Sequence, residues 1–284
     1  MAIKLIASDI DGTIIDDFGN ISQDTRRAIH KLKDYGIRFT FATGRSYEST
    51  LRIAQQLGVD KEDVGMICLN GLQTFTLPSQ DLVEKETLSF EESVTMQHLG
   101  ERYYLGIMYC FDDVIYFQMD DLSYKDYMIA MGDDAKRFFN RNLDVIPVNS
   151  VHDIKERFET DRIQKIAYIQ SPQYMDLIVD RIRKDAGVGY EFMRVGPGWT
   201  EVGIDGVSKG NAVVEYAARY GIKPEEIMVF GDSENDISMF KIAEIAVAVE
   251  NAMDSAKAHA THFTKSNEDH GVAVFIEEYL KSLE

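Results

Sequence analysis

The stretch Ile3-Lys4-Leu5-Ile6-Ala7-Ser8-Asp9-Ile10-Asp11-Gly12-Thr13 decides the fold of this 284-residue chain. Its first five residues form a short, mostly apolar run, which predicts a buried strand. Asp9, Asp11 and Gly12 follow directly. Taken alone, Asp11-Gly12 is an ordinary turn. In an open parallel sheet, however, ligands bind beyond the carboxyl ends of the strands, so both aspartates are candidate site residues.

Strand and helix patterns alternate outward from this stretch, and they return in the last third of the chain. The intervening runs are short and nearly continuously apolar, which favours a parallel sheet covered by helices on both faces. We therefore predict an α/β fold with a Rossmann-like core. The predicted strands are 3–7, 37–42, 64–69, 227–230 and 245–249, and the predicted helices are 25–35, 46–57, 208–220, from Ser233 onward, 252–260 and 269–283.

The middle of the chain has a different pattern. Residues 114–119 and 163–169 read as strands of an antiparallel or half-exposed sheet, with helical stretches such as 174–184 between strands. We interpret this region as a second, α+β domain inserted into the first. The predicted division is a catalytic core of residues 1–83 and 196–284 and an inserted domain of residues 84–195.

Polar residues follow each predicted core strand. Thr43-Gly44-Arg45 follows the second strand, Asn70-Gly71 follows the third, and Gly231-Asp232-Ser233-Glu234-Asn235-Asp236 follows the strand at 227–230. Singly, Asn70-Gly71 is a standard turn, and Ser233 with Asp236 resembles a capping box.

Together these strand ends bring Asp9, Asp11, Asp232 and Asp236 to one edge of the sheet. Two carboxylates at ~4 Å repel by about 4 kcal/mol at an effective dielectric of 20. A cluster of them therefore requires a cation or raised pKa values. The candidate ligands are oxygens, with no nearby cysteine or histidine, which favours Mg²⁺.

Lys209 is a second unusual feature, because a cation in the first turn of a helix opposes the helix dipole. It is either a solvated lysine or a partner for an anion held at that helix start. A phosphoryl group fits the surrounding residues: Gly12 and Gly44 allow backbone N–H groups to approach it, and Thr43 offers a hydroxyl. One aspartate can attack phosphorus while the other exchanges protons with the leaving oxygen and with water.

The motifs DIDGT (9–13), ATGR (42–45), GVSKG (206–210) and GDSEND (231–236) resemble, in this order, those of the haloacid dehalogenase superfamily of phosphatases. ICLNG (67–71) and the inserted middle domain resemble the Cof-type sugar-phosphatase branch, in which the insertion is a cap that selects the substrate. The resemblance covers the whole chain.

This resemblance implies roles for individual residues. Asp9 corresponds to the nucleophile and Asp11 to the general acid and base. Thr43 and Lys209 correspond to phosphate binders, and Gly12, Gly44, Arg45, Asn70 and Gly71 are expected substrate or phosphate contacts. The Mg²⁺ ligands are expected to be Asp9, the Asp11 carbonyl and Asp232, and Asn235 and Asp236 are expected to support the metal and phosphate.

Alternatives remain at this point. A sugar phosphomutase would use the same core chemistry, and a phospho-accepting signalling receiver or a silent sugar-phosphate sensor would share the acidic cluster. Asp11 beside Asp9 argues against both of the non-catalytic alternatives.

The net charge of −18 argues against nucleic acid or an anionic membrane as partner. No apolar run reaches the ~18 residues of a membrane span, and Cys68 and Cys110 form no metal-binding spacing. We expect a cytoplasmic enzyme that acts on a small phosphorylated metabolite without an obligate protein partner.

Overall fold

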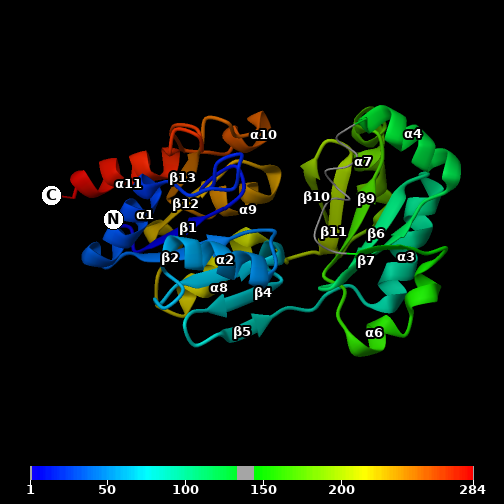
Figure 1. Ribbon diagram of the computed structural model, residues 1–284, viewed down its shortest axis with the longest axis horizontal. Coiled ribbons are helices and arrows are strands. Elements are labelled where there is room, and N and C mark those ends of the chain that lie inside the picture. Colours follow the sequence, from blue (N-terminus) through cyan, green and yellow to red (C-terminus); the bar gives the residue numbers. More distant parts are fainter. Residues whose placement is uncertain (1, 133–143, 284) are drawn as a thin grey trace. The chain divides into compact units, whose positions relative to one another are not determined.

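The computed structural model describes residues 2–132 and 144–283, which divide into two compact units (Figure 1). The first unit comprises Met1–Lys85 and Val207–Glu284, and the second comprises Glu86–Gly206. The sequence pattern had placed the second boundary at residue 195, but the strand Trp199–Ile204 belongs to the second unit. It pairs there with two other strands of that unit, Tyr190–Gly196 and Lys165–Ile169.

The first unit is built on an eight-stranded sheet with the order β14-β13-β12-β1-β2-β3-β4-β5. Its strands are β1 (Leu5–Ser8), β2 (Arg38–Ala42), β3 (Gly65–Cys68), β4 (Gln73–Thr76), β5 (Asp81–Glu84), β12 (Ile227–Gly231), β13 (Ile245–Ala248) and β14 (His262–Phe263). Its α-helices are α1 (Gln23–Lys31), α2 (Tyr47–Leu57), α8 (Lys209–Ala218), α9 (Ile237–Phe240), α10 (Asp254–Lys257) and α11 (Gly271–Lys281), and its 3₁₀ turns are η1 (Leu32–Tyr35), η2 (Leu69–Gly71), η4 (Pro224–Glu226) and η5 (Glu234–Asp236).

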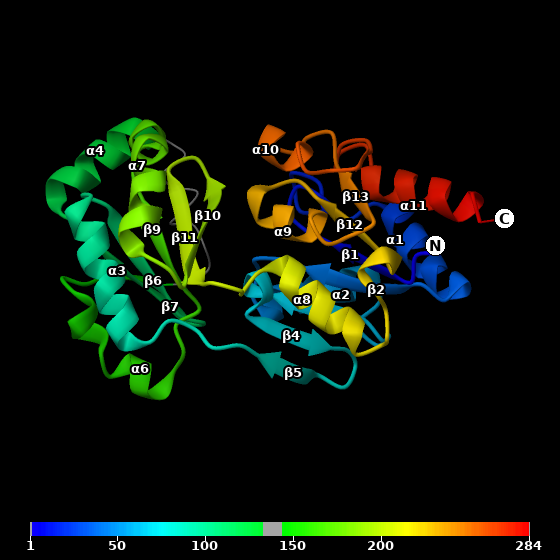
Figure 2. The same cartoon turned by 180° about the vertical axis from the view of Figure 1, so that it is seen from behind.

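The six strands from β14 to β3 run parallel. The five from β13 to β3 were predicted and are largely buried, whereas the short edge strand β14 is exposed and was not predicted. Helices α1, α2 and α11 pack on one face, where they enclose Phe41 and Phe230. Helices α8, α9 and α10 pack on the other, where they enclose Leu5 and Val229. The two opposite views show α2 in front of the sheet in Figure 1 and α8 in front of it in Figure 2. This double covering explains the nearly continuous apolar strands.

The antiparallel strands β4 and β5 were not predicted. They extend the sheet beyond β3 as a hairpin, in which Gln73 pairs with Glu84 and Thr76 with Asp81. Residues 81–84 are exposed, so no buried apolar run marks the edge strand in the sequence. The predicted core boundary at residue 83 falls inside β5.

The second unit contains a six-stranded sheet with the order β10-β11-β9-β6-β7-β8. Its strands are β6 (Gly106–Cys110), β7 (Val114–Gln118), β8 (Asp144–Pro147), β9 (Lys165–Ile169), β10 (Tyr190–Gly196) and β11 (Trp199–Ile204), and its helices are α3 (Phe90–Arg102), α4 (Asp121–Met131), η3 (Val151–Ile154), α6 (Arg157–Thr160) and α7 (Pro172–Ala186). The sheet is antiparallel except for the pair β7 and β8.

The two faces of this second sheet are packed differently. Helices α3 and α7 cover the face that carries Tyr109 and Tyr168. Tyr127 and Met131 of α4 pack on the opposite face, near Trp199. In the described part of the chain, each helix is too short or too polar to cross a bilayer.

Candidate active site

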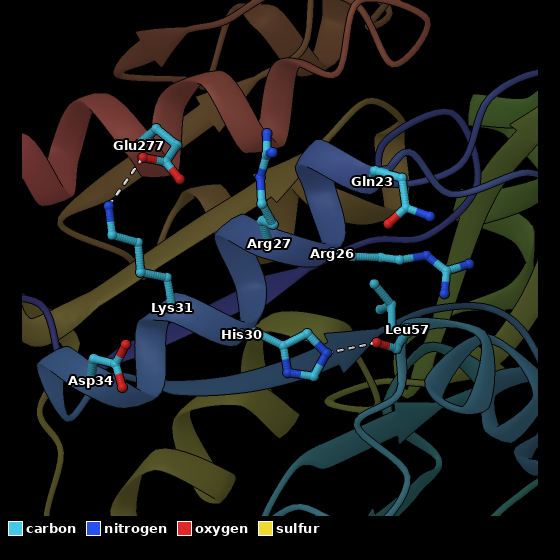
Figure 3. Close-up of a pocket in the computed structure, with 8 residues that line it drawn as sticks. All are labelled: Gln23, Arg26, Arg27, His30, Lys31, Asp34, Leu57 and Glu277. Carbon is cyan, nitrogen blue, oxygen red and sulfur yellow. Dashed lines mark hydrogen bonds and ion pairs between the residues drawn. The ribbon is translucent and has the colours of Figure 1, made fainter.

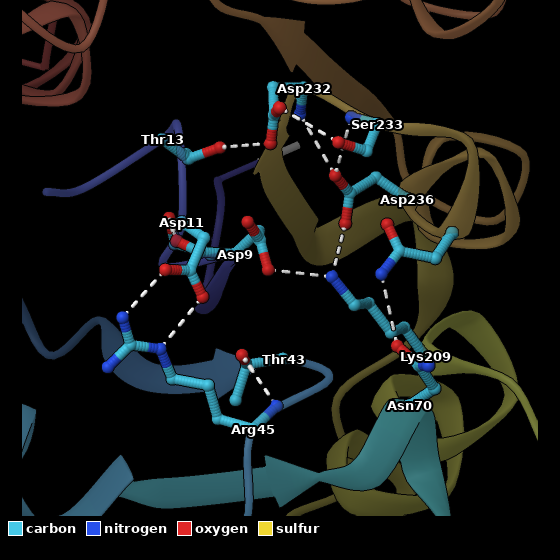
Figure 4. A network of polar contacts seen from close by, with 12 residues as sticks. Asp9, Asp11, Thr13, Thr43, Arg45, Asn70, Lys209, Asp232, Ser233 and Asp236 are labelled. Carbon is cyan, nitrogen blue, oxygen red and sulfur yellow. Dashed lines mark hydrogen bonds and ion pairs between the residues drawn. The ribbon is translucent and has the colours of Figure 1, made fainter. Parts of the chain in front are cut away.

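Four neighbouring parallel strands end at one edge of the first sheet, and their ends are joined by backbone hydrogen bonds. The Asp9 N–H donates to the Phe230 carbonyl at 3.0 Å, which ties the end of β1 to β12. The Thr43 N–H donates to the Ile67 carbonyl, and the Asn70 N–H donates to the Thr43 carbonyl, both at 2.9 Å. The predicted segments after β1, β2, β3 and β12 therefore meet in one place (Figure 4).

Lys209 lies at the centre of this edge and is almost fully buried, with 1% of its surface exposed. It occupies the first position of α8, after the N-cap Ser208. Its Nζ donates to Asp9 Oδ1 and to Asp236 Oδ1, both at 2.7 Å. Burial alone would lower the pKa of Lys209, but the charges of Asp236 and Asp9 outweigh burial and raise it. The solvated-lysine reading is therefore wrong, and Lys209 is a charged group inside the site.

Asp236 is fully engaged by the protein. Its Oδ2 accepts from the N–H groups of Asp232 at 2.9 Å and Ser233 at 3.0 Å, while its Oδ1 accepts from Lys209. The bond from Ser233 is part of the expected capping box, and the two N–H bonds together fix the loop that carries Asp232. Asp236 thus joins the lysine to the Asp232 loop, which is a supporting position.

Asp232 is held by two hydroxyl groups. Thr13 Oγ1 donates to its Oδ1 at 3.1 Å, and Ser233 Oγ donates to its Oδ2 at 2.8 Å. Thr13 was given no predicted role and Ser233 only a helix-capping one, although each lies inside a quoted motif. Their hydroxyls are the signal that could have identified them, because buried carboxylates need donors.

The three carboxylates Asp9, Asp232 and Asp236 each bring one oxygen within 4.8 Å of the others. Burial raises the pKa of Asp9 well above its ordinary 3.8; Lys209 opposes this shift, and the charges of Asp236, Asp232 and Asp11 add to it. Burial, and next the charge of Asp236, raise the pKa of Asp232 to about 6. One lysine does not balance this cluster, so a further cation would stabilise it.

The side-chain atoms of this cluster are ligands that suit Mg²⁺. The cluster offers carboxylate oxygens with no nitrogen or sulfur ligand among its members. The Oδ1 atom of Asn235 is also buried, and among residues 2–132 and 144–283 it has no hydrogen-bond partner. An unpaired buried acceptor of this kind suits a cation or its bound water.

Asp11 does not join the carboxylate cluster. Its side chain points to Arg45, whose Nε donates to Oδ2 at 2.7 Å and whose Nη2 donates to Oδ1 at 2.6 Å. Arg45 Nη1 also donates to Ser49 Oγ at 3.3 Å. The hydrogen bond to Asp11 is the main cause that raises the pKa of Arg45. Arg45 was predicted to contact substrate or phosphate; in this structure it holds the predicted acid and base.

Asn70 and Gly71 line the edge in a strained turn. Asn70 is 4% exposed and has a left-handed backbone with φ 57° and ψ 27°, and its Oδ1 accepts from Asn235 Nδ2 at 3.1 Å. A Cβ on Gly71 would lie 2.4 Å from the Ser208 carbonyl oxygen, so only glycine fits there. A Cβ on Gly44 would lie 3.3 Å from Asn70 Oδ1, which places Gly44 beside this amide.

The turns also offer donors for an anion. Within the described ranges, the N–H groups of Asp11, Gly12 and Gly44 have no hydrogen-bond partner. Thr43 is buried, and its Oγ1 accepts from the Arg45 N–H at 3.1 Å, which leaves the hydroxyl proton for an acceptor. These donors and Lys209 can together bind phosphate oxygens.

A separate hollow of about 700 Å³ lies beside α1 (Figure 3). Its basic side chains are largely committed: Lys31 pairs with Glu277, and His30 Nε2 bonds the Leu57 carbonyl oxygen at 2.8 Å. Arg27 pairs with Asp24. The strand edge, and not this hollow, therefore remains the candidate active site.

Comparison with known proteins places this fold and site in context. The family of haloacid dehalogenase-like hydrolases matches residues 6–276. The 5-amino-6-(5-phospho-D-ribitylamino)uracil phosphatase YwtE of Bacillus subtilis is 27% identical, with 98% of both chains covered. The enzyme of the same name from Escherichia coli, YbjI, is 28% identical, with 99% of this chain and 97% of that one covered. The solved HAD subclass IIB sugar phosphatase BT4131 has the same fold, with a TM-score of 0.73, 23% identity, and 97% and 98% coverage.

Proposed function

Because the chain belongs to the haloacid dehalogenase-like hydrolases and is a phosphatase of that family, we propose that it depends on Mg²⁺ and works through an aspartyl-phosphate on Asp9. Its proposed substrates are small phosphorylated metabolites, most of all sugar phosphates. The observation that carries the proposal is the buried pair of Asp9 and Lys209. Lys209 binds Oδ1 of Asp9. Among the described residues, Oδ2 of Asp9 has no hydrogen-bond partner, so this oxygen can attack phosphorus.

In the first step, Asp9 Oδ2 forms a bond to phosphorus while the bond from phosphorus to the leaving oxygen breaks. Asp11 gives a proton to that leaving oxygen. In the second step, water attacks phosphorus, its proton passes to Asp11, and the bond from phosphorus to Asp9 breaks. Asp9 is then again a carboxylate and Asp11 again a protonated carboxylic acid, and inorganic phosphate is released.

Other residues hold the phosphoryl group. Lys209, the Thr43 hydroxyl and the unpaired N–H groups of Gly12 and Gly44 would bind its oxygens, and Asn70 and Gly71 would border it. Asp9, the Asp11 carbonyl and Asp232 would hold Mg²⁺, with Asn235 and Asp236 in support. When bound, Mg²⁺ neutralises phosphate charge and the repulsion among the carboxylates.

We infer that the second unit selects the substrate, because the residues assigned to phosphoryl transfer, from Asp9 to Asp236, all lie in the first unit. The named relatives act on a phosphorylated ribityl compound, so polyol phosphates belong in the tested panel beside sugar phosphates. Replacing residues 86–206 by a short flexible linker should preserve hydrolysis of an aryl phosphate and reduce discrimination among metabolites. Unchanged selectivity in a folded deletion variant would contradict this inference.

The proposed reaction is tested by phosphate release from that panel, measured with Mg²⁺ and with a chelator. We expect turnover with Mg²⁺, loss of turnover on chelation, and recovery when Mg²⁺ is restored. Full activity in exhaustively chelated enzyme would overturn the metal assignment. Turnover that needs a sugar bisphosphate and releases no phosphate would instead identify a mutase.

A further inference from the structure

Asn251 lies outside the four motifs, three residues after the end of β13, and its side-chain amide is bonded at both ends. Its Nδ2 donates to the Gly12 carbonyl at 2.7 Å, and its Oδ1 accepts from the Asn267 N–H at 3.0 Å. Gly12 is separated from Asn251 by most of the chain. The contact therefore joins the loop after β1 to the loop after β13.

The same short segment also holds the loop after β12. The Met253 N–H, two residues beyond Asn251, donates to the carbonyl of Asp232 at 2.8 Å. Residues 251–253 thus contact both loops that carry the proposed metal ligands. One contact goes through a side chain to Gly12, and the other goes through the backbone to Asp232.

These two loops are packed directly against each other. Gly12 has φ +70°, and a Cβ on this residue would lie 2.9 Å from Oδ2 of Asp232. Thr13, the next residue, bonds the same carboxylate through its hydroxyl at 3.1 Å. A small rotation of the Gly12 peptide would therefore move the loop relative to Asp232.

A second asparagine, Asn267, also binds the loop after β1. Asn267 is 5% exposed, and its Nδ2 donates to the Ile15 carbonyl at 3.0 Å. Its own N–H binds the Asn251 side chain. The loop from Asp9 to Ile15 is thus held at two carbonyls, Gly12 and Ile15, by two linked amides from the C-terminal part of the chain.

We propose that Asn251 is a positioning residue for the Mg²⁺ site, because it fixes the Gly12 peptide and so the neighbouring Asp11 carbonyl relative to Asp232. This inference rests on the proposed function. Mg²⁺ requires near-ideal octahedral geometry and tolerates little error in ligand spacing. Groups that orient metal ligands typically change metal affinity by about 10–100-fold when they are removed.

Asn251 is exposed to solvent. Its replacement should therefore cost little folding stability, so that an effect on metal binding can be measured separately. In an Asn251→Ala variant, water can bond the Gly12 carbonyl, so the fold loses little. Water does not, however, hold that peptide at a fixed distance from the loop after β13. The variant should therefore lose metal affinity without a matching loss of stability.

The test is calorimetric titration of the full-length protein with Mg²⁺ alone. We expect the dissociation constant of Asn251→Ala to rise about tenfold, while saturating Mg²⁺ restores kcat close to that of the wild type. Asn251→Ser serves if the alanine variant does not fold, because its short hydroxyl cannot replace the amide.

Gln170→Ala is the control for the loss of a doubly bonded amide, although Gln170 is more buried than Asn251. Gln170 is also an amide bonded at both ends to backbone groups: it donates to the Tyr104 carbonyl at 2.7 Å and accepts from the Ser171 N–H at 2.9 Å. Because it lies in the second unit, its variant should bind Mg²⁺ like the wild type. Wild-type Mg²⁺ affinity in a folded Asn251 variant would overturn the positioning role. Absence of Mg²⁺ binding by the wild type would instead contradict the proposed function, and with it this inference.

Discussion

Arg45 holds both oxygens of Asp11 through its fork of N–H groups, at 2.7 and 2.6 Å (Figure 4). The proposed acid and base is therefore oriented by a planar, two-point contact in this structure. While Arg45 is so engaged, these two donors are not available to a phosphate oxygen. The pair suggests that Arg45 acts on the reaction through Asp11.

Arg45→Lys keeps the positive charge and loses the fork. If Arg45 positions Asp11, the variant should lose about tenfold or more in kcat with a sugar phosphate, as part of the 10²–10⁴-fold that acid–base catalysis supplies. The loss should be smaller for the first step with an aryl phosphate, whose leaving group needs little protonation. Steady-state and pre-steady-state kinetics with both substrates give this comparison. Equal losses in the first step would assign Arg45 to phosphate binding.

Lys209→Met should remove activity and also destabilise the fold. The helix dipole alone would make the loss of Lys209 harmless to α8, because a cation at a helix start opposes the dipole. Lys209 is, however, buried between Asp9 and Asp236, and these ion pairs outweigh the dipole. Losing one partner of a buried ion pair costs about 3–5 kcal/mol, and losing one transition-state donor costs about 2.7–4 kcal/mol.

Urea unfolding and kinetics of the Lys209→Met variant measure both effects. Lys31→Met is the control, because Lys31 forms a partly exposed pair with Glu277 that should contribute about 0–1 kcal/mol. If the Lys209 and Lys31 variants have the same stability, the buried network does not support the fold.

Mg²⁺ should raise the unfolding temperature more at pH 7.5 than at pH 5. The pKa of Asp232 is raised from its ordinary 3.8 to about 6, mainly by burial. A raised carboxyl pKa means that the folded state binds the proton more tightly. In the metal-free protein this contribution to stability is full below pH 3.8, falls as the pH rises toward 6, and is absent above it.

Above pH 6 Asp232 is ionised, and a cation gains most by binding it. Differential scanning calorimetry at the two pH values, with Mg²⁺ or chelator, measures the difference. Asp232→Asn is the control, in which the Mg²⁺ effect should shrink at both pH values. An equal Mg²⁺ effect at pH 5 and pH 7.5 in the wild type would count against the acidic cluster as the binding site.

The strand-end pattern was enough to predict that the polar residues after the strands meet at one edge of the sheet. Asp9, Thr43, Asn70 and Asp232 each follow a buried apolar strand, and parallel strands bring their ends to one edge. Lys209 could be suspected from its helix position, but its burial could not, because burial depends on which carboxylates the fold brings around it.

Other features depend on contacts that a local pattern does not encode. The strand β11 was assigned to the wrong unit, because its membership is decided by pairing with β9 and β10. The hairpin of the half-buried β4 and the exposed β5 has no apolar alternation strong enough to mark it. Asn251 follows a predicted strand, as the other site residues do, so the same strand-end argument could have identified it.

The most direct test of the mechanism is rapid-quench mass spectrometry with an aryl phosphate, with the phosphoryl group mapped to a peptide. Asp11→Asn should form the adduct in a burst and then turn over slowly, because the nucleophile remains but the base that activates water is lost. Asp9→Asn should form no adduct. We predict the phosphoryl group on Asp9; its appearance on any other residue, or an adduct in Asp9→Asn equal to that of the wild type, would contradict the mechanism.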